Sequence, residues 1–130
     1  MVRVTEELAT EHYRHLKSKA FFPELIKYIQ GEMHDRRKVM ALIYWGTDSI
    51  KKCRELAGAT NPEEADPTSI RGSYGRILTT GLYENVVHVS SNESEAEREI
   101  KLWFMPEEII VDLYPSKIIV EKERKVQAWA

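Results

Sequence analysis

Residues 85–90 read Asn85-Val86-Val87-His88-Val89-Ser90. The branched apolar residues predict a short strand over residues 85–89, with a histidine near its end. A helical pattern follows, in which Asn92 is the expected N-cap and Glu99 comes eleven residues after His88. A carboxylate that arrives from the next helix can orient an imidazole as a nucleophile. Taken alone, the same pattern is more typical of a structural histidine in the core, so the surrounding residues have to decide between the two interpretations.

The rest of the chain predicts an alternation of strands and helices. We expect the end of a strand at 2–4 and a strand over 39–45. Helices are expected from Thr5 to about Tyr13, from Pro23 to Gly31, and from Thr47 or Asp48 to Ala57. The apolar runs at 108–111 and 117–120 are expected to form strands or an extended arm. The run at 39–45 has seven apolar residues in a row, which is typical of a strand buried on both faces. This order of elements indicates an α/β or α+β fold in one domain.

Residues 59–84 lack a regular pattern, because prolines and glycines interrupt them. A loop of this length is usually functional or disordered, and its varied polar composition favours function. It contains Thr60 and Arg71, and Arg54 lies on the preceding helix. Two arginines from different elements suit bidentate contacts with phosphate oxygens, and Thr60 and Asn85 can add neutral hydrogen bonds. The alternatives are a solvated Arg54 and a simple turn at Thr60.

The other histidines are weaker candidates. His12 and His15 are three residues apart on a predicted helix and could bind a metal, but no third ligand accompanies them, which favours packing or solvated roles. His34 lies in a charged turn and is expected to be exposed. Tyr13 and Phe21 are ordinary core residues by type, or one of them stacks on a base.

The composition narrows the possible partners. The chain has 130 residues and a formal net charge of −2, so no basic field points to nucleic acid or to an anionic membrane. The single cysteine, Cys53, excludes an internal disulfide and fits a reducing cytoplasm. No apolar run approaches the roughly 18 residues expected of a membrane span.

Together these residues resemble the nucleoside diphosphate kinase family from Val2 to about Glu108. The segments that carry the resemblance are His12-Tyr13 through Phe21-Phe22, Gly58-Ala59-Thr60-Asn61-Pro62, Thr68-Ser69-Ile70-Arg71-Gly72, and residues 85–90 with the helix up to Phe104. The resemblance implies a ferredoxin-like fold, an α+β sandwich, over residues 1–112, with a divergent C-terminal extension over 113–130. It also implies a ping-pong transfer of phosphoryl groups from nucleoside triphosphates to nucleoside diphosphates, with Mg²⁺ as the cofactor.

The resemblance assigns roles to individual residues. It implies that His88 is phosphorylated, that Glu99 and Ser90 support its ring, and that Tyr13 lies beside it. The residues that it assigns to the nucleotide are Arg54, Thr60 and Arg71 on the phosphates, Asn85 on sugar and phosphate, and Leu16 and Phe21 on the base. The resemblance also implies a cytoplasmic homo-oligomer, either a hexamer or a tetramer. Its implied partners are nucleoside triphosphates and diphosphates, and it implies no contact with a membrane or with nucleic acid.

The sequence departs from the family in three places. It contains no Lys-Pro-Asp motif and begins where the family's second strand is nearly complete. We therefore expect the first strand and helix to be missing, and both neighbours of that internal strand to have unpaired edges. Residues 76–83 are longer than the loop of common members, and residues 113–130 differ from the usual tail. One hypothesis is that an added strand at 117–120 covers the vacant sheet position.

Two functions remain open on these grounds. The first is a nucleoside diphosphate kinase. The alternative is a catalytically impaired module derived from such a kinase, which binds nucleotides or other subunits.

Overall fold

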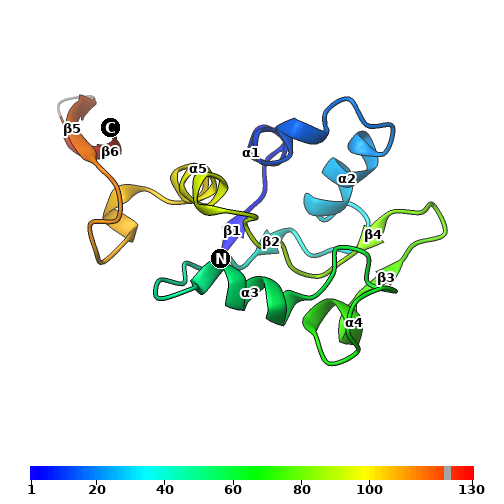
Figure 1. Ribbon diagram of the computed structural model, residues 1–130. Coiled ribbons are helices and arrows are strands. Elements are labelled where there is room, and N and C mark those ends of the chain that lie inside the picture. The colour runs from blue at the N-terminus through cyan, green and yellow to red at the C-terminus, as the bar shows by residue number, and fades with distance from the viewer. Residues whose placement is uncertain (122–123) are drawn as a thin grey trace.

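The computed structural model describes residues 1–121 and 124–130. Figure 1 shows helices arranged around short paired strands, with a hairpin at the C-terminal end that stands away from them. The helices are α1 (Glu6–His12), α2 (Phe22–Ile29), α3 (Ser49–Ala57), α4 (Ile70–Tyr74) and α5 (Glu93–Trp103), with 3-10 helices at Arg14–Leu16 and Pro106–Glu108. The strands are β1 (Val2–Arg3), β2 (Lys38–Val39), β3 (Arg76–Ile77), β4 (Tyr83–Glu84), β5 (Ser116–Glu121) and β6 (Arg124–Trp129). The predicted mixture of helices and strands is confirmed.

The helices begin where their polar capping residues lie. Thr5 Oγ1 accepts a hydrogen bond from the Leu8 N–H at 3.2 Å, which caps α1. Asn92 Oδ1 accepts one from the Glu95 N–H at 3.0 Å, which caps α5. Both caps satisfy a backbone donor that the first turn of a helix leaves free. They confirm the two predicted helix starts.

A small core lies where α1, α2 and α5 meet. Its buried apolar residues are Val4, Ala9 and Ile26, and the partly buried side chains of Phe22, Ile29, Val39 and Trp103 pack against them. Arg98 on α5 donates to the main-chain oxygens of Glu11 and His12, at 3.2 and 3.1 Å. These bonds use carbonyls that the end of α1 cannot pair internally, so they fix α5 against the end of α1.

Two predicted strands differ from the structure. Of residues 39–45 only Val39 lies in a strand, where it pairs with Val2, and residues 85–89 form none. Met40, Leu42, Tyr44 and Trp45 expose 59–77% of their surface. A strand exists only where a neighbour completes its ladder, and no strand among residues 1–121 and 124–130 pairs with these segments. The resemblance implies unpaired strand edges, and in the described part of the chain residues 40–45 and 85–89 have no paired neighbour.

Residues 59–84 are more regular than the sequence predicts. They contain α4, which carries Arg71, and an antiparallel pair formed by β3 and β4. Gly72 allows α4 to pack closely, because a Cβ at this position would lie 2.0 Å from the main-chain oxygen of Asp66. Ser69 Oγ accepts from the Gly72 N–H at 3.1 Å and caps this short helix. The prediction that Arg71 lies in an irregular loop is wrong.

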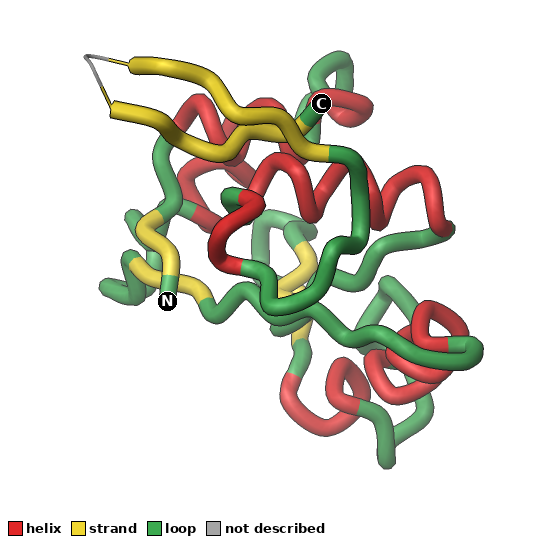
Figure 2. The backbone as a smooth tube through the Cα atoms, turned by 90° about the vertical axis from the view of Figure 1, so that its left-hand side faces the viewer, coloured by secondary structure: helices red, strands yellow, loops and turns green. Residues whose placement is uncertain are grey.

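The C-terminal segment forms a separate hairpin. β5 pairs with β6 over six residue pairs, from Ser116 opposite Trp129 to Glu121 opposite Arg124. The predicted strand at 117–120 is confirmed, but β5 pairs with neither 39–45 nor 86–88, so the hypothesis that it covers the vacant sheet position is wrong. Figure 2 shows the hairpin apart from the strands of the other two sheets. Residues 108–111 form no strand. Trp129 Nε1 donates to the main-chain oxygen of Phe104 at 2.9 Å, which attaches the hairpin to the end of α5.

Among the described residues, no helix has the length and apolarity needed to cross a bilayer.

Candidate active site

His88 lies in a hydrogen-bonded chain with Glu99 and Ser90. His88 Nε2 is 2.9 Å from Glu99 Oε1, and Ser90 Oγ donates to Glu99 Oε2 at 2.5 Å. Glu99 is buried on α5, whereas the side chain of His88 remains 38% exposed. The predicted contact between His88 and the carboxylate of the next helix is confirmed. Ser90 acts on His88 through Glu99 in this structure.

The charge of Glu99 determines which nitrogen of His88 is available. Burial alone would raise the pKa of Glu99, but hydrogen bonds from His88 and Ser90 outweigh it and lower the pKa to about 2. An ionised carboxylate can only accept hydrogen bonds, so Nε2 of His88 carries the proton that it donates to Glu99. In the neutral ring this leaves the lone pair on Nδ1. The arrangement therefore leaves Nδ1 of a partly exposed imidazole with a lone pair that is able to act as a nucleophile.

A second histidine, His12, supports the ring of His88. His12 is buried, and its ring meets the ring of His88 edge to face, with 4.4 Å between centroids. Trp103 Nε1 donates to His12 Nδ1 at 3.0 Å. Burial, together with the nearby charge of His88, lowers the pKa of His12 to about 4, so this ring is neutral near pH 7. The packing role predicted for His12 is confirmed, whereas its contact with Trp103 could not be predicted from the sequence.

The same contact argues against a metal ion at His12. His12, His88 and Glu99 each have a ligand atom within 4.8 Å of the other two. Because Nδ1 of His12 accepts the indole hydrogen bond, the proton of neutral His12 lies on Nε2, which then has no lone pair for a metal. His15, the other member of the predicted pair, is exposed on the 3-10 helix that follows α1.

Tyr13 lies beside the same histidine. Its ring centroid is 6.0 Å from that of His88 and 4.6 Å from that of His12. Burial raises the pKa of Tyr13 to about 12, so its hydroxyl keeps its proton at neutral pH and can donate a hydrogen bond. The predicted position of Tyr13 near His88 is confirmed.

Arg71 fixes the backbone next to His88. Its Nε and one terminal nitrogen donate to the main-chain oxygen of Val87 at 3.3 and 2.9 Å, and the other terminal nitrogen donates to that of Gly58 at 2.8 Å. Burial lowers the pKa of Arg71, and the nearby charge of Arg54 lowers it further. Three of the five N–H groups of Arg71 are used in these bonds, so two can still meet a phosphate.

Four other predicted residues have surface that is available to a ligand. Thr60 is exposed two residues after Gly58, and Asn85 is half-buried between β4 and His88. Leu16 is half-buried on the 3-10 helix after α1, and Phe21 is 45% exposed at the start of α2. No contact tests the nucleotide-binding roles predicted for these four residues, which remain predictions.

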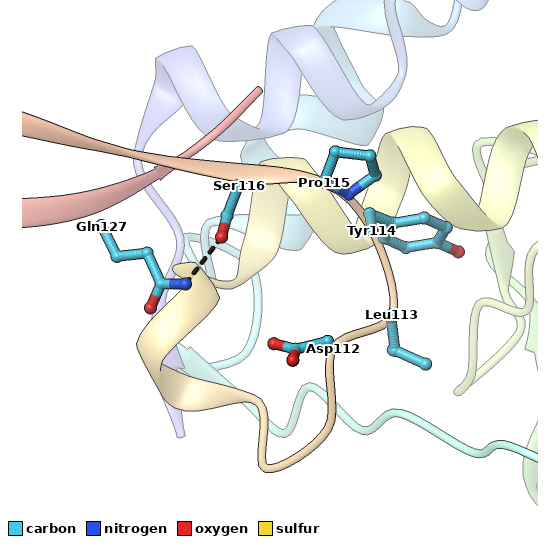
Figure 3. Close-up of a pocket in the computed structure, with 6 residues that line it drawn as sticks. All are labelled: Asp112, Leu113, Tyr114, Pro115, Ser116 and Gln127. Carbon is cyan, nitrogen blue, oxygen red and sulfur yellow. Dashed lines mark hydrogen bonds between the residues drawn. The ribbon is translucent and has the colours of Figure 1, made fainter.

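Two pockets lie outside the histidine cluster. One is a groove between residues 43–46, α3 and the start of α5, and Arg54 and Gly58 contribute to its lining. The other, shown in Figure 3, lies at the base of the hairpin, where Gln127 donates to Ser116 Oγ at 2.6 Å. Neither is lined by His12, His88 or Glu99.

Comparison with known proteins identifies the family. Residues 1–109 match the family model described as nucleoside diphosphate kinase. The chain belongs to the nucleoside diphosphate kinase family. It is 41% identical over 109 residues to the nucleoside diphosphate kinase of Pyrococcus furiosus, which covers 84% of this chain and 64% of that protein. The chain therefore spans slightly less than two thirds of this relative.

Solved nucleoside diphosphate kinases share the fold. The enzyme of Halobacterium salinarum in complex with CDP superposes with a TM-score of 0.73 at 38% identity, over 85% of this chain and 68% of that one. A transition-state mimic of the Borrelia burgdorferi enzyme, with bound vanadate and ADP, superposes with a TM-score of 0.64 at 33% identity, over 85% and 69%. The predicted ferredoxin-like family fold is confirmed.

Proposed function

We propose that this chain transfers a phosphoryl group from a nucleoside triphosphate to a nucleoside diphosphate through a phosphohistidine at His88. The observation that carries the proposal is the chain of hydrogen bonds from Ser90 through Glu99 to His88, which leaves Nδ1 of a partly exposed ring free. Membership of the nucleoside diphosphate kinase family supports it, because phosphoryl transfer is the reaction of that family.

The proposed chemistry needs little proton transfer. Nδ1 of His88 attacks the terminal phosphorus, the bond from that phosphorus to its bridging oxygen breaks, and the nucleoside diphosphate leaves with the bonding electrons. The ring, which gains positive charge, keeps its Nε2 proton, and the hydrogen bond from this N–H to ionised Glu99 stabilises that charge. A second nucleoside diphosphate then attacks the phosphohistidine and restores the neutral ring. Positioning and charge stabilisation carry such a transfer.

The nucleotide would lie between the arginines and the first helices. We propose that Arg54, Arg71 and Thr60 bind phosphate oxygens, and that Asn85 binds sugar and phosphate. The free N–H groups of Arg71 support this assignment, since its bonds to Val87 and Gly58 hold the guanidinium beside the nucleophile. Leu16 and Phe21 would contact the base, and Tyr13 would donate to a phosphate near His88.

We propose that Mg²⁺ arrives with the nucleotide phosphates and neutralises part of their charge. Hard cations of this size prefer oxygen ligands and retain several waters. The cluster of potential metal ligands found among the described residues contains two histidines and an already bonded carboxylate, which does not fit Mg²⁺. Phosphate oxygens are therefore the expected ligands.

We also propose a cytoplasmic homo-oligomer. The single Cys53 supports a reducing compartment, and the exposed apolar side chains of residues 40–45 support burial against other protein. The alternative function is a catalytically impaired module that binds nucleotides or other subunits, and the same exposed segment would suit its contact with other subunits.

The test separates these two functions. The protein is incubated with γ-labelled ATP, and protein-bound label is measured before and after acid treatment. We expect acid-labile labelling of the wild type, none of His88→Ala, and wild-type labelling of His15→Ala, which removes an exposed histidine. Addition of unlabelled nucleoside diphosphate should discharge the label as nucleoside triphosphate. Equal labelling of His88→Ala and the wild type would exclude His88 as the acceptor, and nucleotide binding without labelling would favour the module.

A further inference from the structure

The outer edge of β5 is unpaired and apolar. β5 forms a two-stranded sheet with β6, and no other strand of residues 1–121 and 124–130 pairs with it. Ile118 and Val120 are 72% and 68% exposed, and Ile119 is 38% exposed. Figure 1 shows the hairpin projecting from the side of the molecule beyond α5. An isolated two-stranded hairpin is marginally stable in water, and an apolar edge readily accepts a further strand.

The hydrogen-bond pattern of the hairpin shows which residues face that edge. The Ala130 N–H donates to the Pro115 main-chain oxygen at 2.9 Å, so positions 115 and 130 form a hydrogen-bonded pair. Hydrogen-bonded and non-hydrogen-bonded pairs alternate along an antiparallel ladder. Lys117 and Ile119 therefore bond to β6, whereas the N–H and C=O groups of Ile118 and Val120 point outward.

The sequence of β5 is complementary to itself when it runs antiparallel. It reads Ser116-Lys117-Ile118-Ile119-Val120-Glu121, with three branched apolar residues in a row at its centre. If two copies meet with Ile119 opposite Ile119, Ile118 falls opposite Val120. The outward-facing groups of Ile118 and Val120 then form hydrogen-bonded pairs, as the ladder requires.

We propose that β5 pairs antiparallel with β5 of a second copy of this chain, about a two-fold axis at Ile119. The contact joins two hairpins into a four-stranded sheet and buries the apolar side chains at its centre. It is isologous, so it closes after two copies. The backbone pairing and the apolar match require the same register. The proposal is independent of phosphoryl transfer.

The outer edge of β6 fits a second copy less well. Its Lys125, Val126, Gln127 and Ala128 lack a branched apolar run, and Trp129 is engaged with Phe104. The side chains of 126–129 are also half-buried, whereas those of 116–120 are exposed. The two strands of the hairpin therefore differ, and β5 is the one suited to pairing.

Charge placed at the axis of the full chain tests the register. Association is measured by sedimentation equilibrium over a range of protein concentrations. Ile119→Glu and Ile119→Lys each place like charges opposite one another at the axis, and each should weaken dimerisation about tenfold. An equimolar mixture of the two variants brings opposite charges together and should associate as the wild type does. Lys125→Glu, which changes the charge of β6, is the control and should leave dimerisation unchanged.

Two further variants address the backbone and the axis. Ile118→Pro removes an N–H that bonds nothing within the hairpin, so it should abolish the dimer while circular dichroism still shows the fold. Ile119→Cys should form an intermolecular disulfide under mild oxidation, because residues at the axis face their own copies, whereas Lys125→Cys and the wild type with Cys53 should not. A monomeric wild type, or association that neither a charge at position 119 nor Ile118→Pro weakens, would overturn the proposal.

Discussion

Replacement of Glu99 by glutamine is the sharpest test of how His88 is held. Glutamine keeps the shape of the side chain, and its amide oxygen can still accept from His88, but the negative charge is lost. The surroundings of Glu99 lower its pKa from 4.5 to about 2. At about 1.4 kcal/mol per unit, they favour the ionised form by roughly 3 kcal/mol. Because His88 is 38% exposed, solvent screens part of this interaction, and we take about 2 kcal/mol for its effect on the reacting ring.

This magnitude predicts a fall in the phosphorylation rate of roughly 30-fold for Glu99→Gln. The rate is measured in a single turnover, by rapid quench of the protein with γ-labelled ATP. Glu97→Gln is the matched control, since it makes the same change on α5 at a carboxylate that is 45% exposed and bonded to Lys101. It should react at the wild-type rate. A Glu99→Gln rate within twofold of the wild type, or an equal loss in Glu97→Gln, would refute the role assigned to the Glu99 charge.

Three further predictions concern stability. Trp103→Phe leaves the buried Nδ1 of His12 without its donor and should lower the free energy of unfolding by about 1–3 kcal/mol, measured by urea denaturation. Lowering the pH from about 6.5 to about 4 should destabilise the wild type. The reason is that His12 has a pKa of about 4 in the folded protein, so the unfolded chain takes up this proton at a higher pH. In His12→Gln the free energy of unfolding should lose this dependence on pH. Arg71→Lys cannot bridge Val87 and Gly58 with a planar fork and should cost about 2 kcal/mol in the same denaturation, whereas an unchanged midpoint would contradict the bridging role.

Features that depend on neighbouring residues in sequence were predictable. The caps at Thr5 and Asn92 are each decided within three residues, and both occur as expected. The approach of Glu99 to His88 follows from a helix that begins shortly after the histidine. The position of Glu99 along the helix therefore follows from counting residues. Its burial and its hydrogen bond to Ser90 depend on the tertiary fold.

The strands at 39–45 and 85–89 could not be judged from local pattern. Branched and aromatic residues favour a strand, but the strand itself consists of hydrogen bonds to a neighbour. Without that neighbour, residues 40–45 stay unpaired, and Val86 adopts a positive φ of 68° just before His88. A β-branched residue in this region is strained.

The contacts between distant segments could not be predicted from the sequence either. The indole N–H of Trp103 donates to His12, which lies 91 residues earlier in the chain. Arg71 is predicted to bind phosphates, and its three hydrogen bonds in the structure are all to main-chain oxygens. Both contacts join distant parts of the chain, so residue type indicated which groups need partners but not which partners they find.

The exposed segment at 40–45 provides the protein with its own optical reporter. Trp45 is 77% exposed, while the other two tryptophans, Trp103 and Trp129, are half-buried and hydrogen-bonded. Iodide in solution should therefore quench mainly the emission of Trp45. Any polypeptide that comes to cover this segment would shield that indole and shift its emission to shorter wavelength, so occupancy of the surface can be followed without a label.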